Sequence, residues 1–218
     1  MTDKGTARPL HTRRLFGIQM AVISMRKPHA PTAILTAFLA ILVACTTGQP
    51  TVIEKLDALT AVTVTYCRTP LVMSPDTPLV REARRDYLQV GVLEINQMGA
   101  LRYYLWLGIT EVSQVMTADN HPEGFDSIVL SANGERIELA VAGWTPATIG
   151  TSEPVYQKLF SDSEEAYYQV TLEQIQILTD SDDLTLRTTG PAPKEFISWY
   201  SQTTFESDLA EFLSAVRQ

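Results

Sequence analysis

The chain has 218 residues, of which 45% are hydrophobic and 19% charged, and its formal net charge is −8. This composition excludes a disordered tail, a collagen-like chain and a cysteine-rich scaffold, and the length suffices for one good core. Residues 1–44 hold six Lys and Arg and one acid, which leaves eleven bases and 24 acids in residues 45–218. A surface this acidic repels phosphate backbones, so we expect no nucleic-acid partner.

The boundary between these two parts has the layout of an export signal. Met25-Arg26-Lys27 is positively charged, residues 33–43 form a short apolar run, and Ala44 precedes Cys45. The run is about half as long as a membrane-spanning helix and matches the apolar region of a signal peptide. An ordinary secretory signal cut near Ala44 and an uncleaved anchor are the alternatives.

The tetrapeptide Leu42-Val43-Ala44-Cys45 resembles the lipobox of bacterial lipoproteins. In that family a signal peptidase cuts before the cysteine, whose thiol receives a diacylglycerol and whose new amino group receives a further acyl chain such as palmitate. The resemblance implies that Cys45 is lipidated and that the protein is held at a membrane of the cell envelope. The family of the mature domain is not recognised from its sequence.

The resemblance also implies a domain plan and an address. Thr46 follows the cysteine, in place of the Asp that keeps enterobacterial lipoproteins at the inner membrane, so we expect the outer membrane, facing the periplasm. The plan is a signal peptide at 1–44 (with Met25 or Met20 as an alternative start), a lipidated cysteine and flexible tether at 45–52, and a single globular domain at 53–218.

Cys67 is the only other cysteine. If Cys45 is lipidated, no intramolecular disulfide can form. Cys67 ends the alternating run 62–67, which predicts a strand, and we expect a small buried thiol there, with a reactive cysteine as the alternative.

Two hairpins are predicted in the middle of the chain. The apolar runs 87–95 and 101–109 fit two strands joined by a longer turn, and the second fits a central strand covered on both faces. Asn133-Gly134 suits a two-residue type I′ turn. That turn places Leu130 opposite Ile137 and Ile128 opposite Leu139, so all four apolar side chains share one face.

The C-terminal part mixes strands and helices. Strands are predicted at 167–170 and 184–187, and capping boxes at Thr171 and Thr203 predict a short helix near 172–179 and a C-terminal helix near 204–216. The predicted fold is therefore an α+β domain built on an antiparallel β-sheet or sandwich.

No catalytic or metal-binding motif occurs in residues 45–218, and we expect no enzyme activity, metal or cofactor. The single histidine of this part, His121, is predicted to be a solvent-facing turn residue. The acidic clusters 162–165 and 180–183 lack the spacing of a calcium loop. We expect solvated loops and a helix-end turn there, with a weak cation site as the alternative.

Aromatic residues offer the remaining candidate site. Most should be core, but a groove for a partner or an apolar ligand is predicted from Tyr104, Trp106, Trp199 and Tyr200. Three functions stay open. The favoured one is a non-catalytic interaction or assembly module that contacts another envelope protein. The others are a carrier of a lipid or other apolar ligand, and a hydrolase that uses two acids with different pKa values in one cleft.

Overall fold

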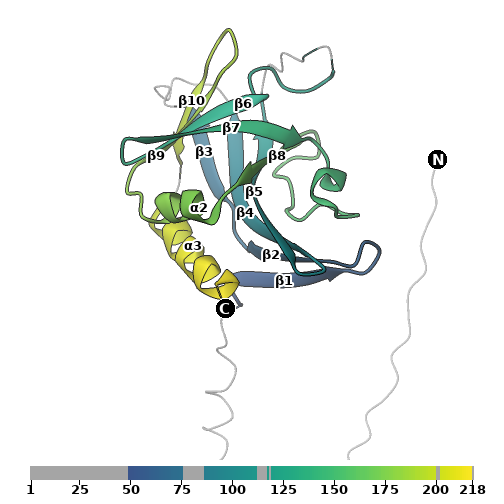
Figure 1. Cartoon of the computed structure of the whole chain (residues 1–218). Helices are drawn as coiled ribbons and strands as arrows, with labels where there is room; N and C mark the ends of the chain where they lie inside the picture. The colour runs from purple at the N-terminus through teal and green to yellow at the C-terminus, as the bar shows by residue number, and fades with distance from the viewer. Residues whose placement is uncertain (1–48, 76–85, 112–116, 118, 200–201, 218) are drawn as a thin grey trace, which may run out of the picture. The chain divides into compact units, whose positions relative to one another are not determined.

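Ten antiparallel strands form one sheet in the computed structural model, which describes residues 49–75, 86–111, 117, 119–199 and 202–217 (Figure 1). The strands are β1 (Val52–Asp57), β2 (Val62–Cys67), β3 (Leu71–Pro75), β4 (Tyr87–Gln97), β5 (Ala100–Thr110), β6 (Ser127–Ala132), β7 (Glu135–Gly143), β8 (Glu164–Val170), β9 (Leu184–Thr188) and β10 (Glu195–Ser198). The predicted residues Ala44 and Cys45 lie outside the described ranges.

Eight of these strands close into a barrel, in the order β4-β3-β10-β9-β6-β7-β8-β5, because β5 pairs back onto β4. The remaining two, β1 and β2, extend the sheet outward, with β2 paired to the far end of β4. The predicted α+β sheet or sandwich is therefore wrong, since the fold is mainly β and closed. Closure depends on the pairing of β10 with β3, and the sequence analysis predicted neither strand.

Two α-helices lie together beside the barrel (Figure 1). Helix α2 (Leu172–Thr179) confirms the predicted helix, including the capping box in which Thr171 and Gln174 exchange hydrogen bonds. Helix α3 (Gln202–Val216) confirms the C-terminal helix but begins at Gln202. Thr203 therefore lies within the first turn, and a capping box there is wrong. No helix among the described residues combines the length and apolar character needed to cross a membrane.

The two predicted hairpins have different outcomes. The β6–β7 hairpin is confirmed in full: Leu130 pairs with Ile137, Ile128 pairs with Leu139, and all four side chains are buried. The β4–β5 hairpin exists, but its turn is only two residues long, because Met98 and Gly99 both adopt positive φ angles. A positive φ angle strains the backbone of a methionine and is uncommon for this residue type. The sequence therefore contains no sign of a two-residue turn at Met98, and a longer turn was predicted.

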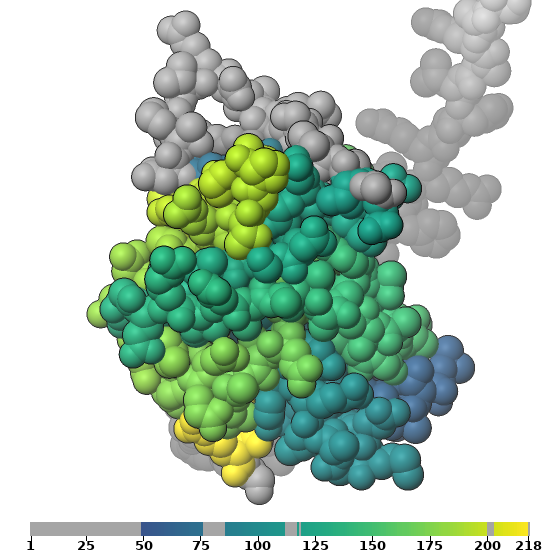
Figure 2. Space-filling model, turned by 45° about the horizontal axis from the view of Figure 1, so that its top comes forward, coloured from purple at the N-terminus to yellow at the C-terminus, as the bar shows by residue number. Residues whose placement is uncertain are grey.

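The barrel interior is filled by side chains. On β5, Leu105, Leu107 and Ile109 join one large buried cluster to which the other barrel strands also contribute. Phe212 of α3 and Leu178 of α2 belong to the same cluster, so the helices cover part of the barrel core. Residues of β7 form part of the outer surface of the barrel, where Glu135, Arg136 and Glu138 are exposed (Figure 2).

A second core lies on the outer face of β4, β5 and β8, under the segment 144–163. This segment begins with the 3-10 helix η2 (Pro146–Ile149) and places Tyr156 over Gly91, where a Cβ atom would overlap with the ring. The Tyr156 hydroxyl donates to the Val92 carbonyl at 2.8 Å. Ser152 donates from its backbone N–H and hydroxyl to Asp57 at the end of β1. These hydrogen bonds, the backbone one foremost, lower the pKa of Asp57.

Cys67 is fully buried, as predicted. Burial, followed by the negative charges of Asp208 and Glu211, raises the pKa of its thiol to about 12. The thiol therefore stays protonated at neutral pH and is a poor nucleophile.

Candidate functional site

Two of the four aromatic residues proposed as a groove, Tyr104 and Trp106, do not line an open surface. Tyr104 and Trp106 are buried in the outer core. Trp106 stacks on Tyr156 with ring centroids 4.7 Å apart, and its Nε1–H donates to Glu165 at 3.2 Å. Trp199 packs edge-on against Tyr87 at 6.2 Å, and Tyr200 lies outside the described residues. Both faces of β5 are covered, as predicted, and this removes Tyr104 and Trp106 from any open surface.

Two loop predictions also change. Glu165, from the acidic cluster 162–165, is buried in β8, where its Oε2 accepts hydrogen bonds from Trp106 and Tyr167. His121 is only half-exposed, since its ring stacks on Trp144 at 4.3 Å with the planes nearly parallel. Neither side chain is therefore the freely solvated loop residue that was predicted: Glu165 is held by two buried donors and His121 by its stacked contact with Trp144.

An open groove of about 440 Å³ does occur where β1, β2, β4 and β5 meet the end of α3. We call it the Glu94 groove. Pairing aligns Glu54, Thr65, Glu94 and Tyr103 in one row across the four strands. Residues directly opposite one another in antiparallel strands share a face, so all four side chains project from the same side of the sheet. The lining residues are Val52, Glu54, Thr63, Thr65, Glu94, Asn96, Leu101, Ala215 and Val216.

Glu94 is the unusual residue of this groove. Glu94 is only 7% exposed. Burial raises the pKa of its carboxyl group, and the negative charge of Glu54 adds a smaller contribution in the same direction. The Tyr103 hydroxyl, which stands opposite Glu94 on β5, opposes this shift. Burial and the Glu94 carboxyl group raise the pKa of Tyr103 to about 12, so its hydroxyl stays protonated at neutral pH.

The second carboxyl oxygen of Glu94 has no partner. Among the residues that the structure describes, nothing hydrogen-bonds to the buried Oε2. Buried acceptors are normally paired, because each unpaired one forfeits the hydrogen bond it made with water. Glu94 was missed by the sequence analysis, although a signal existed: it is the only charged residue in the apolar run 87–95.

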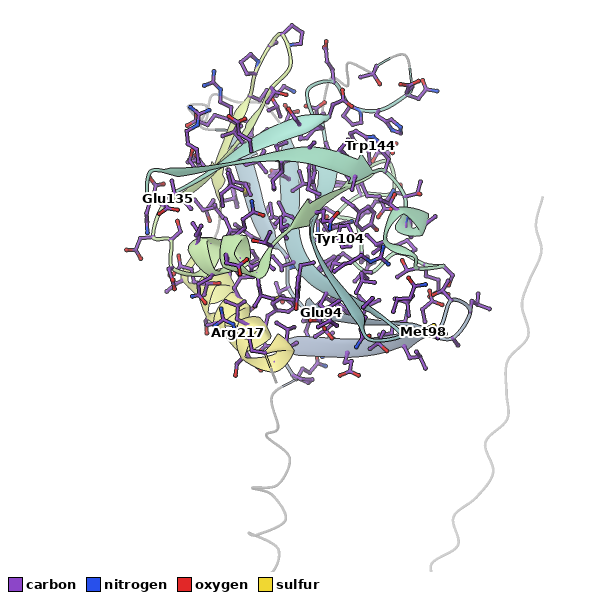
Figure 3. The ribbon with its side chains drawn as sticks, in the orientation of Figure 1. Glu94, Met98, Tyr104, Glu135, Trp144 and Arg217 are labelled. Atoms are coloured by element: carbon purple, nitrogen blue, oxygen red, sulfur yellow. The ribbon has the colours of Figure 1, made fainter. Side chains whose placement is uncertain are left out.

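Exposed apolar side chains lie beside the groove. Leu56 and Leu101 stand at opposite ends of the row that pairs Leu56, Thr63, Asn96 and Leu101. Leu59 and Met98 occupy the two adjacent hairpin turns and are 85% and 98% exposed. Figure 3 shows Met98 at the tip of the β4–β5 hairpin, next to the β1–β2 hairpin. We call these four residues the hairpin-tip cluster.

A second polar cluster, at Lys194, is internally satisfied. The Lys194 ammonium contacts Glu111 at 2.6 Å and Asp86 at 2.9 Å. The Glu111 side chain is nearly buried, and the one ammonium group is already shared by two carboxylates, which fixes the chain that enters β10. Its polar groups already have partners, so this cluster is a weaker candidate for a ligand site than the Glu94 groove.

Comparisons with known proteins give no assignment: no family model, no curated protein and no solved structure matches the chain.

Proposed function

We propose that the chain is a lipid-anchored, non-catalytic binding module of the bacterial cell envelope, which docks onto another envelope protein through its hairpin-tip cluster. The observation that carries this proposal is the exposure of Leu56, Leu59, Met98 and Leu101 on adjacent hairpins. Single exposed apolar side chains are ordinary, but a group of them beside a groove is typical of an interaction site. The lipobox-like sequence supports the anchor.

The start of the domain supports a position close to the membrane. Arg68 fixes the chain ahead of β1, since its guanidinium donates to the Pro50 carbonyl at 2.8 Å and to Gln49 at 2.7 Å. Only three residues separate Gln49 from Cys45. A segment of that length spans at most about 14 Å when fully extended, at about 3.6 Å per residue. A lipid on Cys45 would therefore hold the Glu94 groove, which Val52 lines, near the bilayer, and we propose the periplasmic face of the outer membrane.

The two other functions fit the structure less well. A carrier needs room for its ligand, whereas the barrel interior is filled by the side chains of the main core. For the hydrolase, Glu54 and Glu94 do share a groove. That shared groove and the raised pKa of Glu94 are what favours hydrolysis among the described residues, whereas four exposed apolar side chains on adjacent hairpins favour docking. The docking module is the better supported function.

Photo-cross-linking in intact cells tests the docking surface. A benzophenone amino acid at position 98 should give one discrete cross-linked product, identified by mass spectrometry, and Leu59→Asp should weaken it by placing a charge in the interface. The matched control carries the same probe at Glu135, the exposed first residue of β7, at the other side of the molecule (Figure 3). No product from position 98, or the same product from position 135, would refute this surface.

A further inference from the structure

The floor of the Glu94 groove is rich in hydrogen-bond acceptors. Carboxyl, hydroxyl and amide oxygens come from three adjacent strands: Glu54, Thr63, Thr65, Glu94 and Asn96. No Lys or Arg is among the described residues that line the groove. Three cations directly follow lining residues along the chain, and each donates elsewhere: Lys55 to Glu153, Arg102 to Gln97 and Arg217 to Gln176. The groove therefore lacks a positive charge of its own.

The unpaired Oε2 of Glu94 shows where a ligand would have to supply a hydrogen-bond donor. The side chain is more than nine-tenths buried and lines the groove, yet this oxygen has no donor within the described structure. A ligand that brings a charged donor would satisfy the oxygen and stabilise the ionised carboxylate. Charge-assisted hydrogen bonds of this kind are the strong ones.

The geometry of Glu94 also selects the type of cation. A guanidinium group binds best when both carboxylate oxygens are free to accept in parallel. The buried oxygen that lacks a partner is Oε2, so the groove needs one charged donor at this point rather than a two-pronged one. An ammonium group is compact and binds as a point charge with three donors, and Thr65 and Glu54 stand in the same row as Glu94 to offer further acceptors.

The walls of the groove are apolar. Val52 and Leu101 lie on the sheet side, and Ala215 and Val216 on the helix side. An aliphatic chain can pack on such walls while its charged end reaches the floor, as long amphipathic side chains do.

From these features we infer that the Glu94 groove binds a primary ammonium group at the end of an aliphatic chain, supplied by a lysine side chain of the docked protein. This inference rests on the proposed docking function and names the chemistry that the partner presents. The acidity of residues 45–218, with 24 acids against eleven bases, would attract a basic partner surface.

Ligand-observed NMR with a pair of probes tests the inference. The mature acylated protein, in phosphatidylcholine nanodiscs, is titrated with N-acetyl-lysine methylamide or with N-acetyl-norleucine methylamide, which lacks the ammonium group. We expect saturable binding of the lysine probe alone. Glu94→Gln should weaken it roughly tenfold or more, the effect of one charge-assisted hydrogen bond, and the exposed control Glu135→Gln should leave it unchanged.

A second variant protects the test against misfolding. Thr65→Val keeps the shape of the side chain but removes a hydroxyl acceptor next to Glu94, so it should weaken the lysine probe severalfold. The melting temperature of each variant is measured first. Equal binding of the two probes, or undiminished binding by a folded Glu94→Gln protein, would overturn the inference.

Changing the lipid of the nanodiscs tests whether the ammonium group comes from a protein or from a lipid headgroup. Phosphatidylethanolamine also carries a primary ammonium group, so the titration is repeated in nanodiscs that contain it. Unchanged probe affinity supports the lysine assignment, whereas a large loss would assign the groove to the headgroup and overturn lysine as the occupant. A cross-link from position 98 that persists without ammonium binding would refute this inference but leave the docking function standing.

Discussion

At the scale of single residues, Glu94 shows how a strand can carry an acid into a largely buried position. Its neighbours Leu93 and Ile95 point into the outer core, while Glu94 points to the opposite face, beside the end of α3. The cost of burying a carboxylate appears as the raised pKa of Glu94, and the Tyr103 hydroxyl offsets only part of it. Such a residue destabilises the free protein and is better explained by a ligand than by folding.

This raised pKa predicts a pH dependence of stability. Because the folded protein holds the Glu94 proton above the unfolded pKa of about 4.5, the folded state binds more protons in that window. Ionisation of Glu94 therefore lowers the free energy of unfolding as the pH rises from 4.5 through the folded pKa. The Glu94→Gln variant has no carboxyl group to ionise at this position. Its free energy of unfolding should therefore rise relative to that of the wild type as the pH increases across that range.

Urea unfolding of both proteins between pH 4 and 8 measures the difference in their free energies of unfolding. The contributions of the other titrating groups are nearly the same in both proteins and largely cancel in this difference. Glu135→Gln, which removes a carboxyl group from the exposed start of β7, is the control. A difference between the wild type and Glu94→Gln that stays constant with pH would contradict the burial of Glu94.

At the scale of elements, the β6–β7 hairpin is where local chemistry and tertiary burial agree. Asn133 and Gly134 both adopt positive φ angles, as the type I′ turn requires, and this turn fixes which side chains face the barrel. Leu130 is 1% exposed and pairs with Ile137 on one side and Leu186 on the other.

Leu130→Asp should therefore unfold the domain. An unpaired buried charge costs several kcal/mol, a large part of a typical total stability of about 5–15 kcal/mol. Ser131→Asp is the matched control, because Ser131 points to the outer face opposite Arg136 and should change the melting temperature little. Circular dichroism melting of both variants checks this, and wild-type melting of Leu130→Asp would show that the register is wrong.

The same elements show what the sequence could not reveal. Turn and cap residues act on their immediate neighbours, so the Asn133-Gly134 turn and the Thr171 capping box could be predicted. The Met98 turn could not, because a methionine at positive φ is held there by the surrounding strands rather than by its own preference. Strand β10 has only four residues, too few for a clear alternation of polar and apolar side chains.

At the scale of the whole molecule, barrel closure and the Glu94 groove share one cause. Both depend on pairs of strands far apart in the chain, such as β3 with β10, or on α3 meeting β1. Side-chain alternation tells which face of a strand is buried but not which strand lies beside it. The sequence could therefore indicate antiparallel strands without indicating a closed barrel, and it could mark Glu94 as unusual without placing Val216 across from it.

The position of the whole molecule in the cell depends on one thiol. If Cys45 is acylated, Cys45→Ala removes the attachment site, and two or three acyl chains, each CH₂ contributing about 0.8 kcal/mol, are lost from the bilayer. The protein should then move to the soluble periplasmic fraction or accumulate as an unprocessed precursor. Membrane fractionation and mass spectrometry of the N-terminus distinguish these two results.

Cys67→Ala is the control for this experiment. The Cys67 thiol is buried near α3, where it contacts the Asp208 carbonyl at 3.6 Å, so no lipid can reach it in the folded domain. This variant should remain in the membrane fraction even if it melts at a lower temperature. Membrane association that survives Cys45→Ala would remove the lipid anchor, and with it the argument that the Glu94 groove is held near the bilayer.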